Sequence, residues 1–159
     1  MRNLIIDSNR LWQSLMTMSK IGATEKGGVR RLTLTDLDRQ SRDLFAEWAS
    51  ACGCTMHVDA MGNMFVHRAG TNEALPPVIT GSHLDSQPTG GKFDGAYGVL
   101  AGLEVLRTLN ENKIETEAAL EVVMWTNEEG CRFAPACMGS ATFCGAFALE
   151  YSHGRSDQE

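Results

Sequence analysis

The sequence lacks the long apolar segments that membrane and secreted proteins need. None of its 159 residues lies in a stretch that approaches the roughly 18 apolar residues of a membrane-spanning helix. The first ten residues contain only a short apolar run at positions 4–6, far shorter than the core of a signal peptide. We therefore expect a cytoplasmic protein with no membrane partner.

Basic residues are also scarce. The chain has 14 Lys and Arg against 20 Asp and Glu, a formal net charge of -6. A nucleic-acid backbone is held by clustered basic side chains, so nucleic acid is not an expected partner. The length suits one domain with a real hydrophobic core.

Paired cysteines are missing as well. The five cysteines are an odd number, and they form neither a CxxC pair nor the Cys and His spacing of a zinc finger. Reduced, mostly buried thiols are the expectation for Cys52, Cys54, Cys131, Cys137 and Cys144.

Two helices are predicted in the first third of the chain. Asp7 or Ser8 can cap a helix with apolar residues at near-helical spacing, ending by Gly22. Thr35 can cap a second helix, which ends at Gly53.

The remainder alternates strands with a helix. Residues 55–59 and 64–68 are predicted to form a hairpin, and residues 77–80 a buried strand. A glycine-rich loop, a helix over residues 95–109 and a strand over residues 118–125 follow. This order predicts an α/β fold with a mixed sheet flanked by helices, containing a parallel βαβ unit. Side chains predicted for the core include Trp12, Trp48, Leu103 and Leu106.

Metal-type ligands follow both strands of the βαβ unit. His83 and Asp85 come after the first strand, Glu128 and Glu129 after the second, and Asp94 precedes the helix between them. Ligands in open α/β sheets collect beyond the carboxyl ends of the strands. The sequence thus predicts a site at this edge.

The residue types suggest a role for each side chain. Imidazole and carboxylates suit zinc or manganese, and helix N–H groups could hold Asp94 as a bridge between two ions. This assigns His83, Asp94 and Glu129 to the metals. Asp85 could accept the second ring N–H of His83 or orient its neighbours, and Glu128 could act as general base.

Each of these motifs also has a less specific interpretation. An HxD motif or a pair of glutamates is common, and either alone is weak support for a site. The glycine-rich loop lacks the Lys-Ser/Thr of a P-loop and the GxGxxG spacing. Arg30 and Arg31 are compatible with an anion-binding role or with a solvated loop.

The longest motifs resemble a known family. GSHLDSQPTGGKFDGAYGVLAGLEVLRTL at residues 81–109 and WTNEEGCRFAPACMGS at residues 125–140 are similar to the hydantoinase/carbamoylase family of M20-type amidohydrolases. That family includes N-carbamoyl-L-amino-acid hydrolases, β-ureidopropionases and allantoate amidohydrolases. The likeness also covers residues 21–45 and 59–65, and thus nearly the whole chain.

The resemblance implies the same site residues. His83 would bind one metal, Asp94 would bridge two, Glu129 would bind the other, Glu128 would be the catalytic base, and Asp85 would be the carboxylate beside the metal histidine. The cofactors would be two divalent ions, zinc or manganese, with cobalt or nickel as alternatives. The peptide bond between Asp94 and its successor would be cis.

The resemblance also implies a reaction. It is the metal-dependent hydrolysis of linear C–N amide bonds, with an N-carbamoyl-L-amino acid as favoured substrate, giving the amino acid, ammonia and carbon dioxide. Allantoate is the alternative small-molecule substrate with a ureido group, and an M20 peptidase is less well supported.

Family members are longer than this chain. By resemblance, residues 1–159 would be the N-terminal, metal-binding part of a zinc-exopeptidase-like catalytic domain. The dimerisation and lid domain of the homodimeric family, the rest of the catalytic domain and two further metal histidines would be absent. His57, His67 and His153 are not expected to replace those ligands. The alternative of another class is therefore an inactive fragment that at most binds metal or a partner.

Overall fold

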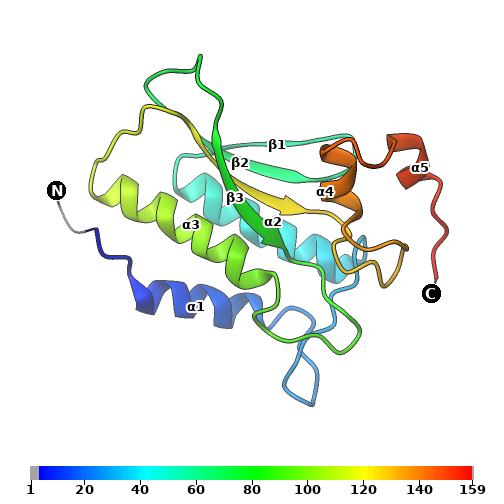
Figure 1. Cartoon of the computed structure of the whole chain (residues 1–159). Helices are drawn as coiled ribbons and strands as arrows, with labels where there is room; N and C mark the ends of the chain where they lie inside the picture. The colour runs from blue at the N-terminus through cyan, green and yellow to red at the C-terminus, as the bar shows by residue number, and fades with distance from the viewer. Residues whose placement is uncertain (1–3, 159) are drawn as a thin grey trace.

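A four-stranded mixed sheet forms the centre of the computed structural model, which describes residues 4–158 (Figure 1). The strand order is β1-β2-β4-β3. Antiparallel pairs join β1 to β2 and β2 to β4, and a parallel pair joins β3 to β4. The predicted hairpin and parallel unit are confirmed. The strands are β1 (Thr55–Val58), β2 (Met64–Arg68), β3 (Val78–His83) and β4 (Leu120–Trp125).

The first two helices begin at the predicted caps. Asp7 precedes α1 (Ser8–Met18), and Thr35 precedes α2 (Asp36–Ala51). Each cap side chain accepts an N–H from the first turn of its helix. This bond satisfies a donor that the helix itself leaves free.

The crossover helix α3 (Ala96–Glu111) lies very close to the sheet. A Cβ atom on Gly102 would lie 3.0 Å from the Val122 methyl groups and 3.2 Å from the Thr80 methyl group. Glycine therefore permits an approach that a larger residue would oppose. Leu103 and Leu106 are buried beside it, as predicted.

The sheet has a different cover on each face. Helices α1 to α3 lie on one face, with α1 packed against α3 (Figure 1). The core between them includes Leu15, Met18, Phe45, Met64, Val66, Leu100, Leu103, Val122 and Met124.

Aromatic side chains occupy the opposite face. Phe143 of α4 (Met138–Phe143) lies 5.5 Å from Phe65 and 5.3 Å from Trp125 between ring centroids. Since Phe65 and Trp125 alternate with strand residues that face the helices, they point away from the main core. The last helix, α5 (Leu149–His153), follows α4.

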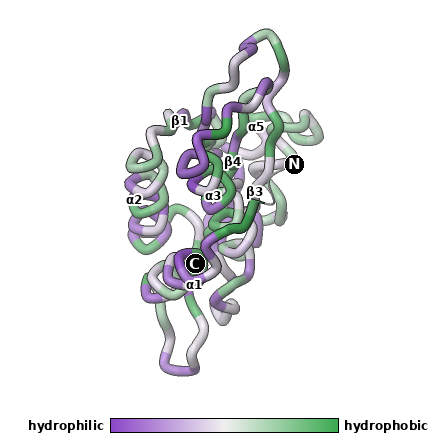
Figure 2. The backbone as a smooth tube through the Cα atoms, turned by 90° about the vertical axis from the view of Figure 1, so that its left-hand side faces the viewer, coloured by the Kyte–Doolittle hydropathy of each residue, from purple (hydrophilic) through white to green (hydrophobic). Residues whose placement is uncertain are grey.

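Three predictions about burial are wrong. Strand β3 is not buried, because it is an edge of the sheet among the described residues, and Val78 is 61% exposed. Figure 2 nevertheless shows part of β3 in the green of hydrophobic residues. Trp12 is 56% exposed and lies against Phe93, although Trp48 does pack on the core. The five cysteines are free thiols but are partly or fully exposed.

Among residues 4–158, no helix is both long enough and apolar enough to cross a membrane.

Packing of α3 on the sheet can be tested with two neighbouring aliphatic residues. We expect Leu103→Ala to lower the free energy of unfolding by about 2–5 kcal/mol, because it leaves a cavity in the core. Val105 lies on the same helix but is 44% exposed, so Val105→Ala should change it by no more than about 0.5 kcal/mol. Urea denaturation measures both, and equal losses would contradict this packing.

Candidate metal centre

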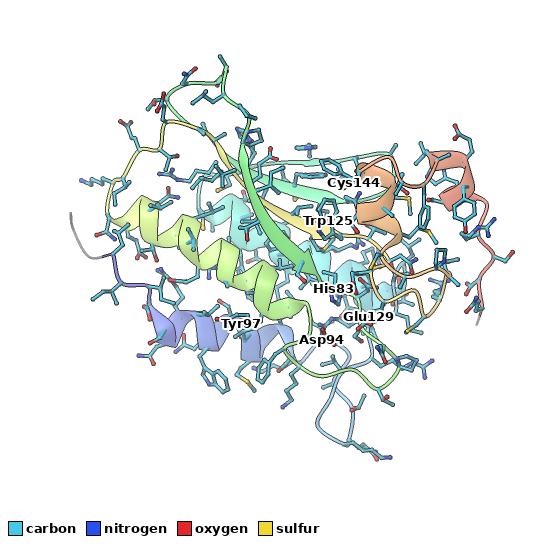
Figure 3. All side chains as sticks on the ribbon, viewed as in Figure 1. His83, Asp94, Tyr97, Trp125, Glu129 and Cys144 are labelled. Carbon is cyan, nitrogen blue, oxygen red and sulfur yellow. The ribbon has the colours of Figure 1, made fainter. Side chains whose placement is uncertain are left out.

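Strand pairing brings the predicted site residues to one edge of the sheet. His83 ends β3 and lies opposite Trp125, the last residue of β4. The loop that follows Trp125 therefore starts beside His83. Figure 3 shows His83, Asp94 and Glu129 close together at this end of the sheet.

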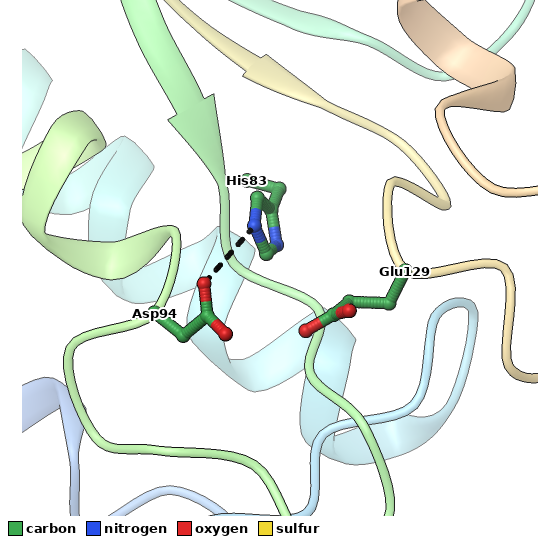
Figure 4. A group of neighbouring side chains, drawn as sticks. All are labelled: His83, Asp94 and Glu129. Carbon is green, nitrogen blue, oxygen red and sulfur yellow. Dashed lines mark ion pairs between the residues drawn. The ribbon is translucent and has the colours of Figure 1, made fainter.

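Three potential ligands point toward a common centre. One ligand atom from each of His83, Asp94 and Glu129 lies within 4.8 Å of the others. Figure 4 shows the three side chains converging, with the ion pair between His83 Nε2 and Asp94 Oδ1 at 3.8 Å. One imidazole and two carboxylates suit a divalent ion such as zinc or manganese.

Glu129 has an oxygen without a partner. Its Oε2 atom accepts a hydrogen bond from Gln87 Nε2 at 3.0 Å, whereas Oε1 is buried and unbonded. A buried carboxylate oxygen without a donor is costly. A bound cation would remove that cost, so the residues present fit a metal. No pattern in the sequence predicts the contact between Gln87 and Glu129.

The His83 ring is oriented by the main chain. Its Nδ1 atom lies 2.8 Å from the carbonyl oxygen of Asp85 and 3.6 Å from the Asp85 carboxylate. The predicted bond to the carboxylate is thus replaced by a bond to the carbonyl. Because a carbonyl only accepts, Nδ1 carries a proton in this contact, and Nε2 is the ring nitrogen that faces the carboxylates.

The Asp85 carboxylate instead holds the second loop. It accepts the backbone N–H of Glu128 at 3.3 Å and that of Glu129 at 3.2 Å. Burial raises the pKa of Asp85 to about 6, and the His83 ring and these two N–H groups oppose that rise. Asp85 therefore links the two strand ends.

Glu128 lies beside the histidine and remains open to solvent. Its Oε2 atom is 3.3 Å from His83 Nε2, and its side chain is 31% exposed. Its Oε1 atom accepts a hydrogen bond from the Cys137 thiol at 3.5 Å. Burial first, and then this contact, raise the pKa of Cys137, which favours the protonated thiol. Sequence reasoning missed Cys137, since nothing in its spacing pairs it with Glu128.

Asp94 differs from its predicted environment. Its side chain is 59% exposed, and the cap residue of α3 is Gly95, which has no side chain, so Asp94 is not the capping carboxylate. The predicted cis bond after Asp94 is also wrong, because the one cis bond in residues 4–158 joins Ala134 to Pro135. Gly95 has φ +65°, and a Cβ there would lie 2.5 Å from His83 Nε2.

Known proteins match almost the whole chain. The profile of peptidase family M28 matches residues 63–153. An N-carbamoyl-L-amino-acid amidohydrolase of Rhizobium meliloti is 52% identical over 99% of this chain and 38% of its own length. A ureidoglycolate hydrolase of Oryza sativa subsp. japonica is 34% identical over 92% of this chain and 30% of its own length.

A solved structure confirms the fold. The amidase of the hydantoinase/carbamoylase family from Burkholderia multivorans superposes with a TM-score of 0.97 at 60% identity. The match covers 99% of this chain and 38% of that one. The chain therefore spans well under half the length of the proteins it matches.

The link made by Asp85 can be tested without metal. We expect Asp85→Asn to lower the free energy of unfolding by about 1–3 kcal/mol at pH 7, because one backbone N–H loses its acceptor. Asp94→Asn is the matched control, expected within about 0.5 kcal/mol, because its side chain is largely exposed. Chemical denaturation with chelator present measures both, and an unchanged Asp85→Asn variant would contradict the link.

Proposed function

Because the chain belongs to the hydantoinase/carbamoylase family of amidohydrolases, and matches the profile of peptidase family M28, we propose that this edge of the sheet is a catalytic metal centre. The reaction is the hydrolysis of linear C–N amide bonds. The observation that carries the proposal is the convergence of His83, Asp94 and Glu129, with a buried Glu129 oxygen left unbonded.

Divalent ions fit the donor set. His83 would hold one ion and Glu129 the other, and Asp94 would be a ligand to both. Zinc or manganese suits these ligands, with cobalt or nickel as alternatives. When bound, such ions polarise a carbonyl group and make water a nucleophile at neutral pH.

Glu128 is the proposed general base. Its carboxylate lies next to His83 Nε2 yet remains partly exposed, so water and substrate can reach it. It takes a proton from the attacking water and delivers it to the departing nitrogen. One water is added across the C–N bond, ammonia leaves, and the carbamate that remains decomposes to carbon dioxide and the free amine. Asp85 acts indirectly, through the backbone N–H groups of both glutamates.

An N-carbamoyl-L-amino acid is the favoured substrate. The relative named for that activity is 52% identical, against 34% for the ureidoglycolate hydrolase. The second relative is named for ureidoglycolate, another ureido compound, and allantoate is the alternative candidate substrate with a ureido group.

Residues 1–159 are proposed to be part of a larger catalytic unit. The relatives extend well beyond the matched segment. We propose that their further length carries the remaining catalytic residues, two metal histidines and a dimerisation and lid domain. This division separates metal binding by this chain from turnover by the whole unit, so each needs its own experiment.

Metal binding can be measured on the chain itself. Calorimetric titration of the metal-free protein with Zn²⁺ should give saturable binding that weakens at least about 10-fold in His83→Ala, because a ligand is lost. His67→Ala is the control, since His67 bonds Glu121 on the sheet rather than the site. Equal affinities in the two variants would refute the proposed centre.

Turnover can be measured in a chimera that has the full length of a relative. A chimera would carry this chain in place of the matching 157 residues of the Rhizobium meliloti enzyme. With Mn²⁺ or Zn²⁺ it should release ammonia from N-carbamoyl-L-amino acids faster than from allantoate. Glu128→Gln should lower kcat by about 10²-fold or more, because proton transfer is lost.

Glu47→Gln, on the exposed side of α2, is the control for that assay and should leave kcat unchanged. Full activity in Glu128→Gln would exclude Glu128 as the base. A folded, metal-binding chimera that releases no ammonia would favour the inactive-fragment alternative.

A further inference from the structure

Arg31 is buried beneath the metal centre. The loop around it was compatible with a solvated or anion-binding segment, but the side chain is 0% exposed. Its guanidinium donates to the main-chain carbonyl oxygens of Leu84 at 3.0 Å, Ile21 at 2.9 Å and Met18 at 3.4 Å. Leu84 lies between His83 and Asp85 in the chain, so the Arg31 side chain contacts the backbone that joins these two site residues.

The main chain of Arg31 contacts the same segment. Its N–H donates to Ser86 Oγ at 2.9 Å, and its carbonyl accepts the Ser86 N–H at 2.8 Å. Arg31 therefore holds the residues on both sides of Asp85, through side chain and backbone together. A segment fixed at Leu84 and Ser86 has little freedom to shift Asp85.

This arrangement has an energetic cost. Burial lowers the pKa of Arg31 from its ordinary value, and the carboxylates of Asp38 and Asp85 oppose that change. Its Nη2 atom has no hydrogen-bond partner. An apolar side chain of similar volume would avoid the desolvation of a charge. Core packing alone therefore does not account for an arginine at this position.

We propose that Arg31 is a positioning residue for the metal centre, an inference that rests on the proposed function. His83 Nδ1 bonds the Asp85 carbonyl, and the Asp85 carboxylate bonds the N–H groups of Glu128 and Glu129. A shift of the segment held by Arg31 would turn the His83 ring and release the glutamates. One guanidinium thereby sets the ligands at both strand ends.

Two substitutions separate geometry from charge. Arg31→Lys keeps the positive charge but loses the planar fork that reaches carbonyls on several sides. Arg31→Met removes both the charge and the planar fork and keeps a long side chain. If charge alone mattered, Met would tighten cation binding because the site would be more negative, and Lys would leave it unchanged. If positioning matters, both variants weaken binding.

The test is calorimetric Zn²⁺ titration of the metal-free chain and its variants. We expect both Arg31 variants to weaken the Zn²⁺ affinity by about 10- to 100-fold, the range for residues that orient metal ligands. Unchanged affinity in Arg31→Lys, or tighter binding in Arg31→Met, would overturn the proposal. Absence of saturable Zn²⁺ binding by the parent chain would instead refute the metal centre itself.

A matched control separates positioning from stability. Arg68 is partly buried and donates to the Ile114 carbonyl and to Asn110 Oδ1, away from the site. Arg68→Lys should lower the thermal midpoint but keep the parent Zn²⁺ affinity. If Arg31→Lys behaves in the same way, its role is structural only and the proposal fails.

A milder variant covers the case in which Arg31 variants do not fold. Ser86→Ala removes the acceptor of the Arg31 N–H and leaves the buried charge in place. We expect it to weaken Zn²⁺ affinity by about 5-fold, the loss associated with one hydrogen bond. A folded Ser86→Ala protein with parent affinity would overturn the proposal.

Discussion

The parallel pairing of β3 with β4 is the constraint on which the site depends. It puts His83 opposite Trp125, so that the loop carrying Glu128 and Glu129 starts beside the histidine. Parallel neighbours need a crossover connection, which α3 supplies while lying close to the sheet at Gly102. Side chains that are more than 40 positions apart in the chain thus meet at one edge, without a long loop to hold them.

Main-chain groups provide most of the support at that edge. A carbonyl fixes the tautomer of His83, and backbone N–H groups anchor the Asp85 carboxylate. Beneath them, the Arg31 guanidinium contacts three further carbonyls. Peptide groups in a packed segment move less than exposed side chains, so such support would hold the proposed ligands in place before a metal binds. Glu128 is left more exposed than the residues that support it.

Electrostatics explain why the arrangement suits a cation. Four carboxylates gather around His83, those of Asp85, Asp94, Glu128 and Glu129. Burial raises the pKa of Asp85, and one oxygen of Glu129 has no donor. A divalent ion would reduce the repulsion among these carboxylates and give the unbonded Glu129 oxygen a partner. Its binding would also stabilise the folded chain by mass action. Folding and the proposed metal binding would therefore be coupled at this edge.

The sequence by itself determined the local elements and the order of chemical groups along the chain. The caps at Asp7 and Thr35 and the βαβ order follow from interactions within a few residues, so they were predictable. The residues that follow the strands were also predictable, although their roles in the site remain a proposal. Only the tertiary structure decided that Trp12 is exposed and Arg31 buried. It also decided the pairing of Cys137 with Glu128 and of Gln87 with Glu129. The tertiary structure likewise decided that the edge of β3 and the carboxylate of Asp94 are exposed. These features depend on which surfaces of distant segments meet, and no local pattern in the sequence encodes that contact.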